Sequence, residues 1–151
     1  MPEDVANELS YTSVYRHSVD EKRRVPVPFR WRPKGGVEFT IIVWAQHQAG
    51  TCLRVLPPAQ WAKLGADIGA MPNNDAKQTL KRRIGSLAIQ AKLDGSGRIA
   101  IPEDMAAAAA IISQAVLVGM LDRFEIWSPE RYEKVEGLDN AHLQDALKMV
   151  G

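Results

Sequence analysis

Short apolar segments separated by turn-forming residues recur along the chain, a pattern typical of strands rather than of long helices. Residues 37–44 and 53–56 are predominantly apolar and predict two strands in the first half of the chain. In the second half, residues 116–121 and 124–127 flank the dipeptide Asp122-Arg123, which predicts an antiparallel hairpin. The pattern therefore predicts a β-rich fold with short connections.

Helix signals fall between and after these strands. Pro102 begins an alanine-rich segment that predicts a helix up to Ile112, because proline is tolerated in the first turn and alanine is the best helix former. Ser128-Pro129 predicts the start of another helix, with the serine as its cap. Between the halves, Asp75 is expected to cap a helix that carries four apolar residues inward, namely Leu80, Ile84, Leu87 and Ala88.

The chain contains an internal repeat. Residues 19–28 recur as residues 93–102, at an offset of 74, in the pattern apolar, Asp, three variable residues, Arg, apolar, any residue, apolar, Pro. Residues 53–61 likewise parallel residues 124–132, and the matching blocks keep the same order along the chain. The sequence therefore predicts two diverged copies of one small unit.

The repeat divides the chain into five parts. We expect a flexible N-terminal extension (1–10), a first unit (11–68), a bridging loop and helix (69–89), a second unit (90–136) and a C-terminal helix (137–151). Each unit is expected to run strand, tight turn, strand, short helix, strand, strand, helix. A unit of fewer than about 60 residues buries too little surface to be stable alone. We therefore expect the two units to pack as a pseudo-symmetric pair with an α+β, β-rich fold.

The composition is that of a soluble globular protein, with 46% hydrophobic and 25% charged residues among 151. Its apolar runs are far shorter than the ~20 residues of a membrane-spanning helix, and acidic residues near the N-terminus do not fit a signal peptide. We therefore expect a cytoplasmic protein with no membrane partner. The single cysteine, Cys52, predicts buried packing, and the four tryptophans are interpreted as core: Trp31, Trp44, Trp61 and Trp127.

Charge is distributed unevenly, although the formal net charge is only +1. Residues 77–98 contain six basic residues and one acidic residue, whereas residues 122–151 are net acidic. The chain contains no phosphate-binding glycine loop and no HExxH, G-x-S-x-G or Cys-x-x-Cys motif. We therefore expect no enzymatic activity, no metal site and no cofactor.

The repeated Asp-x-x-x-Arg motif is the strongest functional feature of the sequence. Its structural interpretation is that Asp20 and Asp94 each close a tight turn and pair with the arginine that follows. Its functional interpretation is that the arginines reach phosphates or guanine edges of DNA, and both interpretations can hold at once. We assign the aspartates and Gly97 to turn stabilisation, because a carboxylate that faces phosphates is repelled.

The basic residues around these turns are the candidates for DNA contact: Lys22, Arg23, Arg24 and Arg98. Three consecutive basic residues in a turn have little use in packing, whereas a β-ribbon that reads DNA requires them. Arg82 and Arg83 on the bridging helix are interpreted either as part of a solvated basic face or as supporting phosphate contacts.

With these motifs the chain resembles the MraZ family of bacterial transcriptional regulators. The resemblance rests on the two Asp-x-x-x-Arg hairpins and on residues 121–127, and it runs from about Tyr11 to Tyr132. It implies two tandem AbrB-like swapped-hairpin β-barrel units and sequence-specific binding to repeated promoter elements of the division and cell-wall gene cluster. It also implies assembly into a ring-like homo-oligomer, and a location on the nucleoid. By position, the DNA-contacting arginines are Arg24 and Arg98.

One position departs from the family pattern. The family has glycine immediately before the arginine, which Gly97 keeps, but Arg23 stands there in the first copy. If this position requires a positive φ, Arg23 adopts it at some energetic cost or the turn changes type. A different class of function also stays open, namely an oligomeric protein-interaction scaffold that does not bind DNA.

Overall fold

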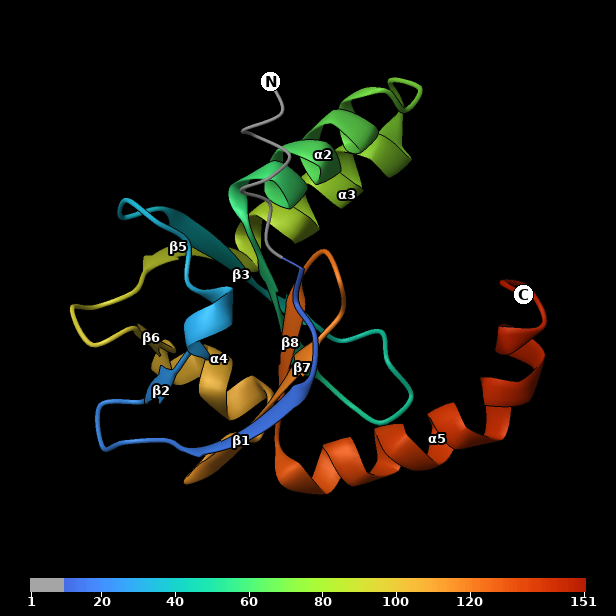
Figure 1. The fold of residues 1–151 in the computed structure, drawn as a ribbon. Coiled ribbons are helices and arrows are strands. Elements are labelled where there is room, and N and C mark those ends of the chain that lie inside the picture. The colour runs from blue at the N-terminus through green and yellow to red at the C-terminus, as the bar shows by residue number, and fades with distance from the viewer. Residues whose placement is uncertain (1–9) are drawn as a thin grey trace.

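The computed structural model describes residues 10–151, and in this range eight strands run antiparallel in two sheets (Figure 1). The first half of the chain contributes β1 (Val14–Ser18), β2 (Arg24–Pro26), β3 (Glu38–Trp44) and β4 (Cys52–Leu56). The second half contributes β5 (Ala88–Lys92), β6 (Arg98–Ala100), β7 (Gln114–Gly119) and β8 (Phe124–Trp127). The predicted flexible extension lies, except for Ser10, outside the described residues.

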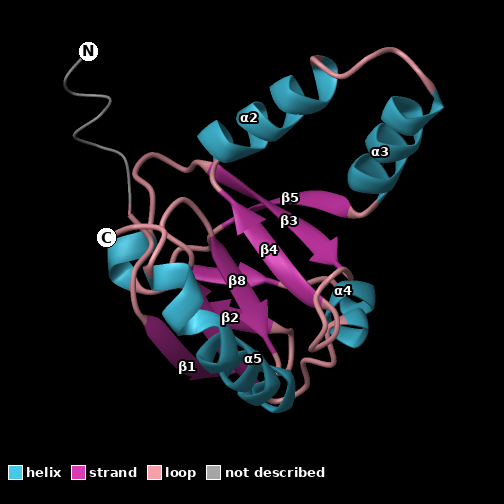
Figure 2. Cartoon of the chain, turned by 90° about the vertical axis from the view of Figure 1, so that its right-hand side faces the viewer, coloured by secondary structure: helices cyan, strands magenta, loops and turns pink. Residues whose placement is uncertain are grey.

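Helical segments separate and follow these strands. They are the 3-10 helix η1 (Phe29–Trp31) and the α-helices α2 (Pro58–Gly69), α3 (Asp75–Ser86), α4 (Glu103–Ala108) and α5 (Pro129–Leu147). The order strand, strand, short helix, strand, strand, helix therefore occurs twice, with α3 between the two occurrences. Figure 2 shows α2 and α3 standing off the sheet as a pair, and Figure 1 shows α5 leading away from the body of the molecule.

The strands of the two halves are interleaved. The six-stranded sheet has the order β1-β7-β8-β4-β3-β5, and β2 pairs with β6 in a separate two-stranded ribbon. β1 pairs with β7, with Val14 opposite Val118, and β5 pairs with β3, with Ile89 opposite Ile41. The counterparts in the two halves are β1 and β5, β3 and β7, and β4 and β8. Exchanging them gives the same strand order read from the opposite edge of the sheet, so the halves are related by pseudo-two-fold symmetry. The predicted α+β, β-rich fold class is confirmed.

An aromatic cluster forms the centre of the core. Trp31 lies against Phe124, with ring centroids 4.9 Å apart, and Tyr11 and Phe39 pack on Phe124 at 5.7 and 5.6 Å. All four side chains are almost completely excluded from solvent. Each of these contacts joins the first half of the chain to the second, so the halves share one hydrophobic core.

A second cluster attaches α5 to the sheet. Trp127 and Cys52 are fully buried there, and Tyr132 packs on them from α5. Burial raises the pKa of the Cys52 thiol to about 12, which leaves it a neutral packing group, as predicted. Of the four tryptophans interpreted as core, Trp31 and Trp127 are confirmed, whereas Trp44 and Trp61 are only half-buried.

The helix α4 ends earlier than predicted. The prediction that the alanine-rich helix reaches Ile112 was wrong, because α4 ends at Ala108 and Ala110 takes a positive φ of 56°. This reversal lets Ile111 donate its N–H to the Ala106 carbonyl and enter the core. Packing of one isoleucine thus overrides the helix propensity of alanine.

The observed caps of α3 and α5 can be compared with the predicted ones. Asn74, rather than Asp75, caps α3 by accepting a hydrogen bond from the Lys77 N–H, and Ala88 belongs to β5. Ser128 caps α5 as predicted. α5 is one continuous helix, so the boundary expected at 136/137 falls inside it. None of the helices in residues 10–151 combines the length and apolar character needed to cross a bilayer.

We expect Leu117→Ala to lower the free energy of unfolding by about 2–5 kcal/mol, measured by urea denaturation. Leu117 is fully buried and lies opposite Tyr15 of β1 and Ile126 of β8. The matched control is Leu121→Ala, which changes a side chain that is 69% exposed and should shift the free energy by no more than about 0.5 kcal/mol. Equal effects of the two substitutions would contradict a core shared by both halves.

Candidate nucleic-acid interface

The first Asp-x-x-x-Arg motif forms a tight turn, Asp20–Arg24, between β1 and β2. The Asp20 carboxylate accepts hydrogen bonds at Oδ1 from the N–H groups of Lys22 (2.9 Å) and Arg24 (2.8 Å). Its Oδ2 accepts from Arg24 Nε at 2.7 Å. Two backbone hydrogen bonds between Asp20 and residues 23 and 24 complete the turn. We call this segment the first turn.

The second motif, Asp94–Arg98, repeats this geometry between β5 and β6. Asp94 Oδ1 accepts from the N–H groups of Ser96 (2.9 Å) and Arg98 (3.0 Å), and Oδ2 accepts from Arg98 Nε at 2.9 Å. The Gly97 N–H donates to the Asp94 carbonyl at 2.9 Å. We call this segment the second turn, and its bonds match those of the first turn one for one.

The two turns lie next to each other on the surface. A terminal nitrogen of Arg98 lies 3.6 Å from Asp20 Oδ2, so Asp20 interacts with an arginine from each turn. The side chains of Asp20, Arg24, Asp94 and Arg98 are between 30% and 33% exposed, which makes them accessible to a ligand. Both turns protrude on the left of Figure 1, at the β2–β6 ribbon.

Both carboxylates are held in the ionised form. The pKa of Asp20 is lowered, chiefly by the hydrogen bond from the Arg24 backbone N–H and further by the Arg24 side chain. The pKa of Asp94 is lowered in the same way by the Arg98 backbone N–H. Each ionised carboxylate holds the Nε of its arginine, and the two terminal amino groups of that arginine carry further hydrogen-bond donors.

The residue before each DNA-contacting candidate, Arg24 and Arg98, has a left-handed backbone conformation, which is the first of the two alternatives left open by the sequence. Gly97 has a φ of 77° and Arg23 a φ of 60°, so the turn type is kept and Arg23 adopts a conformation that costs about 1–3 kcal/mol. The Arg23 side chain is half-buried, and its Nε donates to the Ile101 carbonyl at 3.0 Å. Lys22, in contrast, is exposed.

A further arginine at this site was missed by the sequence motif. Arg32, just after η1, donates from Nε to the Val27 carbonyl at 2.8 Å, and its guanidinium lies against Gly97. One sequence signal could have indicated Arg32. The equivalent positions 23 and 97 hold arginine and glycine, which suggests that a side chain from elsewhere fills the space beside Gly97.

The other predicted basic residues lie apart from the turns. Arg82 and Arg83 are exposed on α3, which projects with α2 at the top of Figure 1, away from the ribbon. The structure therefore brings together Lys22, Arg23, Arg24 and Arg98, and separates them from the pair on α3. Among residues 10–151, no group of three or more His, Cys, Asp or Glu side chains is arranged to hold a metal ion.

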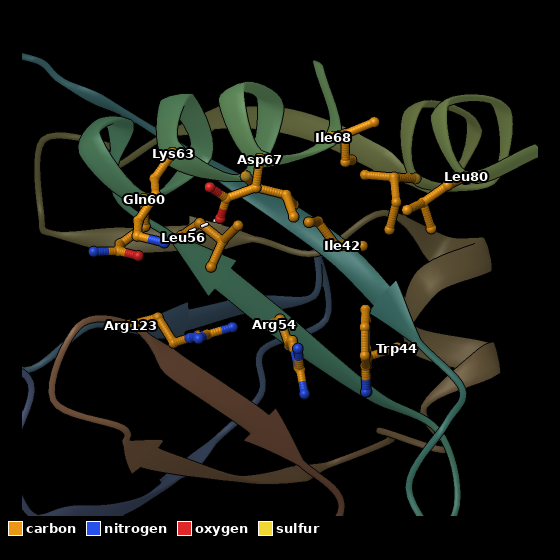
Figure 3. Close-up of a pocket in the computed structure, with 12 residues that line it drawn as sticks. Ile42, Trp44, Arg54, Leu56, Gln60, Lys63, Asp67, Ile68, Leu80 and Arg123 are labelled. Carbon is orange, nitrogen blue, oxygen red and sulfur yellow. Dashed lines mark hydrogen bonds and ion pairs between the residues drawn. The ribbon is translucent and has the colours of Figure 1, made fainter. Parts of the chain in front are cut away.

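A cavity of about 270 Å³ lies between the sheet and the α2–α3 pair (Figure 3). Arg54 lines it, stacked on Trp44 at 3.6 Å from the ring centroid, with Glu125 3.9 Å away. Arg54 Nε is buried and has no hydrogen-bond partner within the described residues, and burial lowers the pKa of this guanidinium. Arg123 and Leu80 also line the cavity, so it combines positive charge with apolar walls.

Known proteins are similar in sequence to this chain over most of its length. A model of the antitoxin-like MraZ protein family matches residues 86–147, which include the second turn. A protein named "Transcriptional regulator MraZ" from Leuconostoc citreum is 32% identical over 121 residues, covering 79% of this chain and 81% of the relative. Its namesake from Alcanivorax borkumensis is 32% identical over 138 residues, covering 87% of this chain and 92% of the relative. The chain belongs to the MraZ family.

Membership of the MraZ family confirms the resemblance inferred from the motifs. A further MraZ relative, from Roseiflexus castenholzii, is 33% identical over 124 residues and covers 80% of this chain. Each of these shares is larger than either half of the chain, so the kinship with MraZ proteins extends over both halves rather than over one copy of the repeat.

Acidification should weaken the turns. Because the folded-state pKa values of Asp20 and Asp94 lie below the ordinary value of about 3.9, the carboxylates stabilise the fold above about pH 4. This stabilisation is lost as the pH falls through the lowered folded-state pKa values. Urea denaturation from pH 7 to pH 3 should therefore show the wild type losing its advantage over the Asp20→Asn/Asp94→Asn double variant. A constant difference across this range would contradict the assignment.

Proposed function

We propose that this protein is a sequence-specific DNA-binding transcriptional regulator that uses the first and second turns to bind repeated promoter elements of the division and cell-wall gene cluster. The observation that carries the proposal is the pair of matching, partly exposed turns on one ribbon, each with an arginine held by an aspartate. The printed name of the relatives, transcriptional regulator, supports it. Such a regulator would act in the cytoplasm, on the nucleoid.

The geometry of the arginines suits recognition of base edges. Arg24 and Arg98 are each oriented by a carboxylate at Nε, which limits the loss of side-chain freedom on binding. Their terminal amino groups can then make the paired hydrogen bonds that guanine or phosphate accepts. Short β-ribbons are known to enter DNA grooves, and the β2–β6 ribbon has this form.

Charge around the turns supports phosphate binding. Exposed Lys22 stands two residues from Arg24 in the first turn and places a second positive charge there. Arg82 and Arg83 on α3 would make supporting phosphate contacts only where DNA extends from the ribbon to the α2–α3 pair. The swapped pairing of strands supports assigning one AbrB-like copy to residues 11–68 and one to residues 90–136, with the two copies forming a swapped-hairpin barrel together.

Arg24→Ala should weaken binding to DNA from the protein's own upstream promoter region by about 5- to 150-fold, because a bidentate arginine contact is worth about 1–3 kcal/mol. Fluorescence anisotropy over a salt series measures this loss, and Arg98→Ala should act in the same direction. Lys134→Ala is the control, since Lys134 is exposed on α5 and lies outside the turns. Absence of DNA binding by the wild type, with assembly intact, would favour the alternative function of an oligomeric protein-interaction scaffold.

We further propose that the protein assembles into a ring-like homo-oligomer. The end of α5 and the residues that follow it expose apolar side chains, namely Leu143, Leu147, Met149 and Val150. The cavity beside α2 and α3 offers apolar walls with positive charge. Contact between two different surfaces of neighbouring copies closes into a ring when the rotation allows it. A ring would present many turns to repeated DNA sites, so that avidity adds to the affinity of each.

Leu143→Glu/Leu147→Glu should lower the mass of the assembly measured by light scattering, because it places two charges in an apolar contact. The matched control, His142→Glu/Gln144→Glu, adds the same groups at neighbouring exposed positions of α5 and should leave the mass unchanged. An unchanged mass for both variants would remove α5 from the assembly contact.

A further inference from the structure

The residue after each ribbon strand makes two hydrogen bonds, one to the backbone of the opposite turn and one to an arginine side chain. Ile101, after β6, donates its N–H to the Arg23 carbonyl at 2.9 Å and accepts from Arg23 Nε at 3.0 Å. Val27, after β2, donates its N–H to the Gly97 carbonyl at 3.0 Å and accepts from Arg32 Nε at 2.8 Å. Val27 and Ile101 are equivalent positions of the repeat. Arg23 therefore provides both the backbone carbonyl and the guanidinium that bind Ile101. For Val27, Gly97 provides the backbone carbonyl and Arg32 provides the guanidinium.

The second turn has room for Arg32 only because residue 97 is glycine. A Cβ atom on Gly97 would lie 2.2 Å from Arg32 Cζ and 2.3 Å from Arg32 Nε, far inside van der Waals contact. The ring of Phe29 covers the same guanidinium, 5.6 Å from Cζ. In the first turn the guanidinium belongs to the turn itself, since Arg23 occupies the position equivalent to Gly97. The two turns thus reach one arrangement by two different residue choices.

We infer that Arg23 and Arg32 are positioning residues of the DNA-binding site, and that Arg23 is not a phosphate contact. This inference rests on the proposed function. Arg23 directly precedes Arg24, and its bonds to Ile101 hold the first turn in place. Gly97 directly precedes Arg98, and its bond to Val27 holds the second turn. These bonds therefore set the spacing of the two DNA-contacting arginines. A ligand that engages both arginines depends on this spacing. Arg23 stands where the second turn has Gly97, and its guanidinium takes the role that the Arg32 guanidinium has there. Its presence is thus explained without an added charge for DNA.

The salt dependence of DNA binding separates a positioning arginine from a phosphate contact. Arg23→Gly suits the φ of 60° and should fold normally, yet it removes the bond to Ile101. We expect Arg23→Gly and Arg32→Ala each to weaken binding on the order of tenfold, with an unchanged log–log slope against salt. Lys22→Ala is the contrasting variant and should reduce the magnitude of this slope by about 0.9. A reduction of this size in Arg23→Gly would overturn the inference.

A double-variant cycle tests the packing of Arg32 on Gly97 independently of DNA. Gly97→Ala should lower stability in urea because its methyl group meets Arg32. In Gly97→Ala/Arg32→Ala the loss should be smaller than the sum of the two single losses, since the clash is gone. Additive losses would overturn the packing argument. If the wild type does not bind DNA, the proposed function fails; if it binds and neither Arg23→Gly nor Arg32→Ala weakens binding, only this inference fails.

Discussion

Pairing of strands between the two halves of the chain is the constraint on which the rest of the structure depends. β1 and β5 lie at the two edges of the six-stranded sheet, and each pairs with a strand of the other half. Because of this exchange, Phe124 from the second half is enclosed by Tyr11, Trp31 and Phe39 from the first. Neither half could bury these aromatic rings alone, which is why two units of marginal size form one stable body.

The same exchange sets the geometry of the candidate DNA site. It brings β2 and β6 together as a ribbon, and the turns that precede these strands therefore emerge side by side, close enough for Asp20 to interact with Arg98. Each turn is closed internally by its own aspartate and is fixed externally by the strand end of the opposite half. The arginines are consequently held by the core of the whole chain rather than by a flexible loop.

Features that depend on local chemistry, such as the two turns, could be predicted from the sequence. Features that depend on contacts between distant residues could not. The Asp-x-x-x-Arg repeat identified both turns, because an aspartate that accepts hydrogen bonds from the following N–H groups needs no tertiary partner. The end of α4 could not be read in this way, since it depends on the burial of Ile111 against residues far along the chain. Arg32 was missed for the same reason, because it acts on Gly97, a residue that is close in space and remote in sequence.

Interleaved strands also govern the order in which the chain can acquire its structure during synthesis. The pairing of Val14 with Val118 joins residues 104 positions apart, so β1 has no partner until β7 has left the ribosome. At about 5–20 residues per second this interval lasts roughly 5–20 seconds. During that time the β3–β4, β3–β5 and β2–β6 pairings and local helices can form, but the edge of β1 stays open to other nascent chains. Because these strand pairings join residues that are far apart in sequence, we expect a chain with this topology to fold slowly.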